Sequence, residues 1–152
     1  MENGSHLCLA MELLEANLLQ CLDTRSGMCL SNVKVVMRQV LQGLEFLHTK
    51  AGIIHTDIKP ENILLANSGN MSLSLPVEGL KVKIADLGSS CLVARHFSLS
   101  IGTTEYRGPE LLLGLEKTDE QQLGGYGPPV DVWAAACLAF ELSTGSDDFI
   151  WK

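Results

Sequence analysis

Polar side chains of different chemical kinds lie close together between two apolar runs, in residues 54–65 (IHTDIKPENILL). Asp57 can orient a hydroxyl group and accept its proton. Lys59 lies two residues on, projects from the same face of an extended chain and can reach an anionic oxygen. Asn62 offers a neutral oxygen, a ligand that Mg²⁺ accepts. These groups match the needs of phosphoryl transfer, in which a hydroxyl is held in line, metal ions bridge the phosphates and positive charge meets the developing negative charge.

A second carboxylate, Asp86, directly follows a predicted strand at residues 82–85. Gly88 lies two residues further on and allows the backbone to turn sharply. We therefore expect Asp86 to return to Asn62 and to complete the metal site. Three polar types occur in one stretch because three separate tasks meet there.

Two helices are expected to position these groups. Apolar side chains recur at helical spacing after a potential N-cap at Ser31, which predicts an amphipathic helix of about five turns that ends at Ala51-Gly52. A second helix is predicted to open with Asp131 in its first turn and to stop at Gly145. It is apolar nearly all the way round, which is typical of a helix buried on every side.

Short apolar runs predict small strands. Residues 7–14 resemble a buried strand that runs into a turn, and three further strands are expected at residues 53–54, 63–65 and 82–85. Residues 66–79 are rich in Ser, Asn and Gly and read as a surface loop or insertion, and residues 86–128 read as irregular.

Composition limits the classes of protein to consider. The chain has 152 residues, 46% of them hydrophobic, and a net charge of -7. This charge argues against non-specific binding to nucleic acid or anionic lipid and suits a basic partner. The five cysteines form no C-x-x-C pair, so neither a disulfide framework nor a zinc site is indicated. No signal peptide and no membrane-spanning run is recognisable, so we expect a soluble intracellular protein with reduced thiols.

Four motifs, in order along the chain, resemble those of eukaryotic protein kinases. HTDIKPEN (residues 55–62) looks like the catalytic loop and DLG (86–88) like the metal-binding D-F-G. GTTEYRGPE (102–110) is similar to the segment that ends the activation region, and DVW (131–133) resembles the start of the buried central helix. Four motifs in this order are far more specific than any one of them.

The resemblance is strongest to the SR-protein (serine/arginine-rich protein-specific) kinases. Tyr106-Arg107 is a pair found in the group that contains these and the cyclin-dependent kinases, and Thr56 occupies the place of the SR-protein kinase threonine in the catalytic loop. LKVKIADLG, ACLAFELSTG and NGSHLCLAMELL are also similar to SR-protein kinase stretches. SR-protein kinases carry a long insertion before D-x-G, and the corresponding insertion is short here.

The resemblance implies an α+β, protein kinase-like fold that is partial. Residues 1–14 would be the last strand of the N-lobe and the hinge. Residues 15–152 would be an incomplete helical C-lobe up to the central buried helix, with small strand pairs around the catalytic loop and a short insertion at residues 66–79.

The resemblance also assigns roles to the polar residues. Asp57 would be the catalytic base, and Lys59 would contact the transferred phosphate. Asn62 and Asp86 would hold Mg²⁺. Thr103 would hydrogen-bond to Asp57 and Lys59 and shape the hydroxyl site.

Further residues would contact ATP. The backbone of Glu12 and Leu14 would hydrogen-bond to the adenine, and Leu64 would pack beneath the ring. Glu61 and Lys59 belong to the same set of ATP-contacting residues.

Two residues of the loop have other expected roles. His55 would be a packed structural histidine, stacked against Leu87 and tied to Asp131. Thr56 stands where many kinases have an Arg that pairs with a phosphate on the activation segment, and Thr cannot form that pair. We therefore expect a kinase that does not need phosphorylation of this segment.

By resemblance, the chain uses ATP and Mg²⁺ and acts on Ser in Arg/Ser-rich proteins in the cytoplasm and nucleus, with no direct binding to nucleic acid or membrane. Two alternatives stay open. No Gly-rich loop or N-lobe lysine precedes Leu7, so the chain alone could be a non-catalytic remnant with a binding or regulatory role. Dual-specificity kinases of the same group also carry His-Thr-Asp and are the second subfamily considered.

Overall fold

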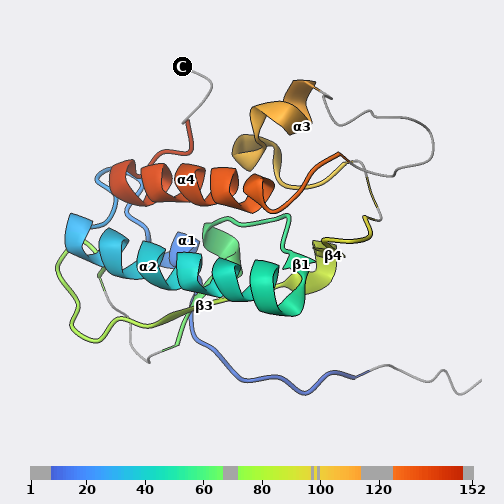
Figure 1. Cartoon of the computed structure of the whole chain (residues 1–152). Coiled ribbons are helices and arrows are strands. Elements are labelled where there is room, and N and C mark those ends of the chain that lie inside the picture. Colours follow the sequence, from blue (N-terminus) through green and yellow to red (C-terminus); the bar gives the residue numbers. More distant parts are fainter. Residues whose placement is uncertain (1–7, 67–71, 97, 99, 114–124, 149–152) are drawn as a thin grey trace, which may run out of the picture.

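A computed structural model of the chain describes residues 8–66, 72–96, 98, 100–113 and 125–148. Two long helices, α2 (Leu30–Phe46) and α4 (Pro129–Thr144), pack against each other and form the centre of the molecule (Figure 1). Two small sheets and several short helical turns surround this pair. The main core contains apolar side chains of both helices, of α1 (Leu18–Cys21) and of two of the strands. A second, smaller core consists of Ile54, Cys91, Ile101, Tyr126 and Val130.

Helix α2 begins one residue before its expected N-cap. The N-cap position is Cys29, whose carbonyl accepts the N–H groups of Asn32 and Val33, and Ser31 lies in the first turn, with its hydroxyl 3.1 Å from the Cys29 Sγ. The Ser31 prediction is therefore wrong. The helix continues into a π-helical turn, η1 (Leu47–Ala51), and ends at Gly52 with φ 65°, where the sequence predicted its end.

Helix α4 was predicted almost to the residue. It ends at Gly145, which adopts φ 78°. Its apolar face buries Leu138 and Leu142 completely against α2 and the strands. The prediction that this helix is buried on every side is wrong, because the Val132 side chain in its first turn remains 52% exposed.

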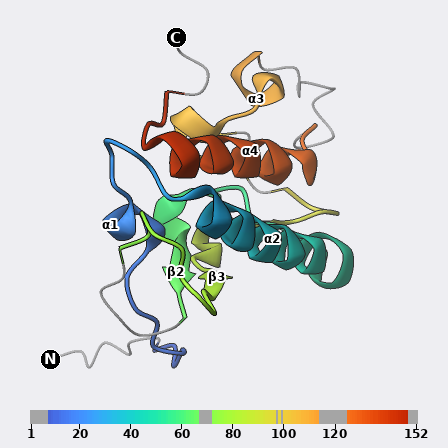
Figure 2. The same ribbon diagram turned by 90° about the vertical axis from the view of Figure 1, so that its left-hand side faces the viewer.

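Two antiparallel strand pairs flank the helices. β1 (Ile53–Ile54) pairs with β4 (Cys91–Leu92), and β2 (Ile63–Leu65) pairs with β3 (Val82–Ile84). Figure 2 shows β2 and β3 beside α1 and below α2. The three strands expected after residue 50 are confirmed, whereas β4 lies in a region predicted to be irregular.

The strand expected at residues 7–14 does not form in the part that the structure describes. Leu9, Met11 and Leu13 are 76%, 82% and 95% exposed, and no strand lies within residues 8–14. A strand needs a partner to satisfy its backbone groups. The first such bonds occur where the Glu15 N–H donates to the Leu65 carbonyl and the Leu65 N–H to the Ala16 carbonyl.

The remaining described elements are short. η2 (Pro60–Asn62), η3 (Leu87–Ser89), η4 (Thr104–Tyr106) and α3 (Pro109–Leu113) are single turns or little more. Of the predicted insertion, residues 67–71 lie outside the described residues, and Leu73 is buried beneath α2 with its carbonyl bonded to the Asn32 amide. No helix among the described residues is long and apolar enough to cross a membrane.

Candidate active site

The loop of residues 55–62, called the polar loop below, joins β1 to β2 and is held by one carboxylate of α4. Asp131 is fully buried and accepts the backbone N–H of His55 on Oδ2 and that of Thr56 on Oδ1, both at 2.8 Å. Thr56 has φ 71°, a left-handed conformation that costs about 1–3 kcal/mol in a non-Gly residue. Such a conformation persists only where the surroundings fix it, as Asp131 does here.

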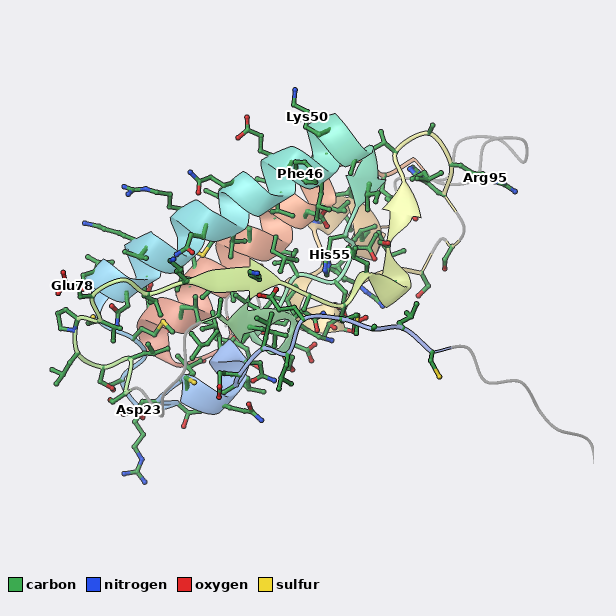
Figure 3. The ribbon with its side chains drawn as sticks, turned by 90° about the horizontal axis from the view of Figure 1, so that it is seen from below. Asp23, Phe46, Lys50, His55, Glu78 and Arg95 are labelled. Atoms are coloured by element: carbon green, nitrogen blue, oxygen red, sulfur yellow. The ribbon has the colours of Figure 1, made fainter. Side chains whose placement is uncertain are left out.

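Two histidines form hydrogen bonds that help to hold the polar loop. The His48 Nε2, on the π-helical turn η1, lies 2.7 Å from the Asp131 Oδ2. The His55 side chain lies in the interior (Figure 3), where its Nε2 is 2.9 Å from the Ala85 carbonyl and its Nδ1 accepts the Asp57 N–H. The tie of His55 to Asp131 therefore runs through the backbone rather than the ring, and His48 is a contact that the sequence did not reveal.

Asp57, Lys59 and Thr103 form one hydrogen-bonded cluster. The Lys59 Nζ lies 2.9 Å from the Asp57 Oδ2 and donates to the Thr103 Oγ1 at 2.9 Å. Thr103 donates to the Asp57 Oδ1 twice, from its backbone N–H at 3.1 Å and from its hydroxyl at 2.7 Å. The structure thus brings together three predicted site residues, although Thr103 lies 46 positions after Asp57.

These contacts set the charges of the cluster. Partial burial by itself would raise the pKa of Asp57, but the hydrogen bonds from Thr103 and Lys59 outweigh it, and the pKa lies below 3.8. For Lys59, partial burial acts to lower the pKa, while the Asp57 carboxylate and the charges of Glu61 and Asp86 raise it above 10.5. Asp57 is therefore anionic and Lys59 cationic at neutral pH.

Asn62 and Asp86 offer oxygens beside this cluster. The buried Asn62 amide donates to the Asp57 carbonyl at 2.8 Å and to the Asp57 Oδ2 at 3.3 Å, so its own side-chain oxygen is not used in these bonds. The Asn62 carbonyl accepts the Ala85 N–H at 2.9 Å, which places Asp86 directly after a residue bonded to Asn62. The exposed Asp86 has φ 63°, and only its Oδ1 accepts the Gly88 N–H.

This donor set fits Mg²⁺. Magnesium sites commonly use one or two protein oxygens and complete their octahedron with water and phosphate oxygens. The described residues contain no group of three or more His, Cys, Asp or Glu side chains that could hold a metal alone. Asn62 and Asp86 are therefore suited to a metal ion that arrives with a phosphate ligand.

The residues predicted to contact adenine lie along the other strand pair. The exposed Glu12 forms an ion pair with Lys83, which stands opposite Leu64 in the β2–β3 register. Leu14 is half-buried in the extended segment leading to the Asn17–Leu64 bridge. Glu61 is exposed in η2 and acts on Lys59 through its charge. The structure thus brings Glu12 and Leu64 to one strand pair.

A cavity of about 540 Å³ opens beside Asp57 and Thr103. Its remaining lining is mostly small and hydroxyl-bearing, with Thr56, Gly88, Ser89, Ser90, Ser98, Ser100, Ile101 and Gly102. The cavity thus leaves open space beside Asp57.

The model of the protein kinase domain family matches residues 1–151. This chain belongs to the protein kinase domain family. The partial kinase-like α+β fold predicted from the motifs is confirmed.

Kinases of two related kinds are similar to this chain. A serine/threonine-protein kinase SRPK of Physarum polycephalum is 33% identical over 190 residues, which cover 94% of this chain and 42% of that protein. A dual specificity protein kinase YAK1 homolog of Arabidopsis thaliana is 38% identical over 143 residues, covering 93% of this chain and 13% of the relative. Human dual specificity tyrosine-phosphorylation-regulated kinase 3 is 35% identical over 147 residues, covering 95% and 22%.

The chain thus spans less than half the length of these curated relatives. The alignment with the Physarum kinase is longer than the 152 residues of the chain itself, so that kinase carries additional residues inside the matched region.

Proposed function

We propose that this chain is the catalytic part of a protein serine/threonine kinase that transfers the γ-phosphoryl group of ATP to Ser in Arg/Ser-rich proteins. The observation that carries the proposal is the cluster of Asp57, Lys59 and Thr103, in which an ionised carboxylate is fixed by two neighbours at 2.9 Å or less. Membership of the kinase family supports the reaction type.

Each residue has a defined task in this proposal. The substrate hydroxyl approaches the Asp57 carboxylate, which holds it in line and accepts its proton as the phosphoryl group arrives. The cationic Lys59 stabilises negative charge on the transferred group. Thr103 fixes the Asp57 carboxylate through two hydrogen bonds, so little reorganisation is needed in the transition state.

Asn62 and Asp86 would hold Mg²⁺, which supplies charge neutralisation on the nucleotide phosphates when bound. ATP is the proposed cosubstrate. Its adenine would lie near the segment that contains Glu12 and Leu14 and against Leu64. The backbone of this segment offers the hydrogen bonds, so the Glu12 side chain is free to pair with Lys83.

Preference for a basic substrate is supported by charge. The chain carries a net charge of -7. Near the site, the exposed Glu61 carboxylate adds negative charge that acts on Lys59. Arg side chains flanking a serine would be attracted to this side of the site. The similarity to a kinase named SRPK agrees with this preference. Action in the cytoplasm and nucleus belongs to the same proposal.

Incubation of the purified chain with labelled ATP, Mg²⁺ and an Arg-Ser repeat peptide tests the proposal. We expect label on serine, and we expect Asp57→Asn to abolish it while ATP binding is kept. If the wild-type chain transfers no label but binds ATP normally, the chain is a non-catalytic binding fragment instead.

A second candidate is a dual-specificity kinase, favoured by the 38% and 35% identity to relatives with that name. A positional-scanning peptide array separates the two. Preference for Arg next to Ser supports the Arg/Ser-directed kinase, whereas preference for Pro after Ser, or label on the catalyst's own tyrosines, supports the second candidate.

A further inference from the structure

The hydroxyl of Thr56 joins the polar loop to the turn that follows the second carboxylate. Thr56 is only 6% exposed, and its Oγ1 donates to the Ser89 carbonyl at 2.9 Å. Ser89 ends η3, the turn whose N-cap is Asp86. The bond spans 33 positions of the chain. It therefore connects the loop that carries Asp57 and Asn62 to the turn that begins at Asp86.

The backbone conformation of Thr56 is unfavourable for a β-branched residue. Among the described residues, Thr56 and Asp86 are the non-glycine residues with positive φ, at 71° and 63°. Gly, Asn and Asp enter this left-handed region more easily than other residues, whereas a β-branched residue found there is an outlier. A Gly or Asn at position 56 would still offer its backbone N–H to Asp131. The reason for a Thr at this position must therefore lie in its side chain, whose hydroxyl reaches Ser89.

The turn η3 is fixed by hydrogen bonds rather than by burial, because none of its three residues is buried. The chain is tied to the polar loop just before the turn, where the Ala85 N–H donates to the Asn62 carbonyl at 2.9 Å. It is tied to the same loop again at the end of the turn, through the bond from Thr56 to Ser89. These two ties enclose Asp86, so the polar loop sets where its carboxylate lies.

The bond from Thr56 also connects two walls of the cavity beside Asp57. Thr56 and Asp57 line this cavity from the polar loop, and residues 88–90 line it from the turn. Loss of the hydroxyl would let these two walls separate. Such a movement would change the position of Asp86 relative to Asp57.

We propose that Thr56 is a positioning residue, whose hydroxyl holds η3, and with it the Asp86 carboxylate, at a fixed place relative to Asp57 and Asn62. For its consequence in metal binding and phosphoryl transfer, this inference rests on the proposed kinase function. The order of the turn can be measured without that function.

Thr56→Val tests the inference, because Val keeps the shape and the β-branch of Thr and removes the hydroxyl. Two amide protons report on the turn: the Gly88 N–H donates to the Asp86 Oδ1, and the Ser90 N–H donates to the Leu87 carbonyl. In Thr56→Val, amide hydrogen exchange followed by NMR should be about three- to tenfold faster at both, which corresponds to the loss of one hydrogen bond. Thr56→Ser keeps a hydroxyl and should return the exchange to near the rate of the wild type.

Thr49→Val is the matched control. The Thr49 hydroxyl donates to the Glu45 carbonyl at 2.7 Å, so this substitution removes a bond of the same kind. Thr49 is exposed on η1, outside the site. Its substitution should leave exchange at Gly88 and Ser90 unchanged.

In the active protein the same displacement should weaken the use of Mg²⁺. Residues that orient a metal ligand commonly affect metal affinity tenfold or more, so KM for Mg²⁺ should rise about tenfold in Thr56→Val, and kcat should fall. Thr56→Ser should restore both values, and Thr49→Val should change neither.

The outcomes separate this inference from the proposed function. A wild-type chain without transferase activity would count against the function, while faster exchange at Gly88 and Ser90 in Thr56→Val, restored in Thr56→Ser, would still support the positioning role. Unchanged exchange in Thr56→Val would overturn that role, as would an equal change in Thr49→Val or a lack of rescue by Thr56→Ser. If Thr56→Val does not fold, Thr56→Ala removes the hydroxyl with less crowding of the left-handed backbone. If neither variant folds, the hydroxyl serves only the stability of the fold, and the inference is overturned.

Discussion

Substitution of Asp131 by Asn is expected to destabilise the chain more than any surface change of charge. Asp131 is fully buried and serves three donors: the His55 N–H, the Thr56 N–H and the His48 ring. Asn keeps the shape of the side chain but replaces one accepting oxygen by an NH₂ group. Because the two backbone donors lie on different oxygens, one of them must then face another donor.

The magnitude follows from these bonds. A hydrogen bond to a charged group contributes about 1.5–3 kcal/mol, and a buried donor left without an acceptor costs about 1–3 kcal/mol more. Asp131→Asn should therefore lower the free energy of unfolding by about 4 kcal/mol, within the range measured when one partner of a buried charged contact is removed. This is a large part of the 5–15 kcal/mol that stabilises a typical domain.

Urea denaturation at neutral pH, followed by circular dichroism, measures the effect as a lower midpoint with an unchanged slope. The matched control is Glu78→Gln, which removes one carboxylate from the exposed loop at one end of the molecule (Figure 3) and should change stability by less than about 0.5 kcal/mol. A loss below about 1 kcal/mol for Asp131→Asn would refute the view that this carboxylate holds the polar loop.

Two other predictions concern acid stability and backbone packing. Because the pKa of Asp57 lies below its ordinary value, its stabilising contribution is complete above about pH 4 and is lost as the pH falls through the lower folded pKa. Thermal melts should therefore show that Asp57→Asn is less stable than the wild type near neutral pH and that the difference disappears in strong acid; a constant difference would contradict this. Gly27 and Gly79 share φ 67°, but a Cβ at Gly27 would lie 2.6 Å from the Ser143 backbone, whereas one at Gly79 meets nothing within 4 Å. Chemical denaturation should show that the free energy of unfolding falls by about 1 kcal/mol in Gly79→Ala and by at least about 3 kcal/mol in Gly27→Ala. Equal losses would contradict this reasoning, because they would mean that α4 can shift to accommodate the new methyl group.

The sequence predicted helices and strands correctly where the local residue pattern matches the environment of those residues in the folded protein. Both long helices carry apolar side chains at helical spacing, and their left-handed ends are glycines, Gly52 and Gly145, that only need local freedom of the backbone. The strands at residues 53–54 and 63–65 lie between punctuating residues and were placed correctly for the same reason. Residues 8–14 show the opposite case, because an apolar run says nothing about whether a partner strand is present to pair with it.

The sequence predicted which residues lie in the site, but it did not predict the long-range hydrogen bonds that hold them. Asp57, Lys59 and Asn62 stand within one short motif, and Thr103 was assigned by resemblance. The bond from His48 to Asp131 spans 83 positions and that from Tyr106 to Glu141 spans 35, so no local spacing reveals them. Both depend on how α4 packs across the loop and the turn, which is a property of the assembled core.

The left-handed Thr56 has a dynamic consequence. The strained conformation of the polar loop is held from outside, by the Asp131 carboxylate and by the hydrogen bond from the Thr56 hydroxyl to the Ser89 carbonyl. Relaxation of Thr56 would release strain and separate Asp57 from Thr103 without melting either long helix. The exchange of the His55 and Thr56 amide protons should therefore report a local opening of the polar loop, which can be faster than global unfolding.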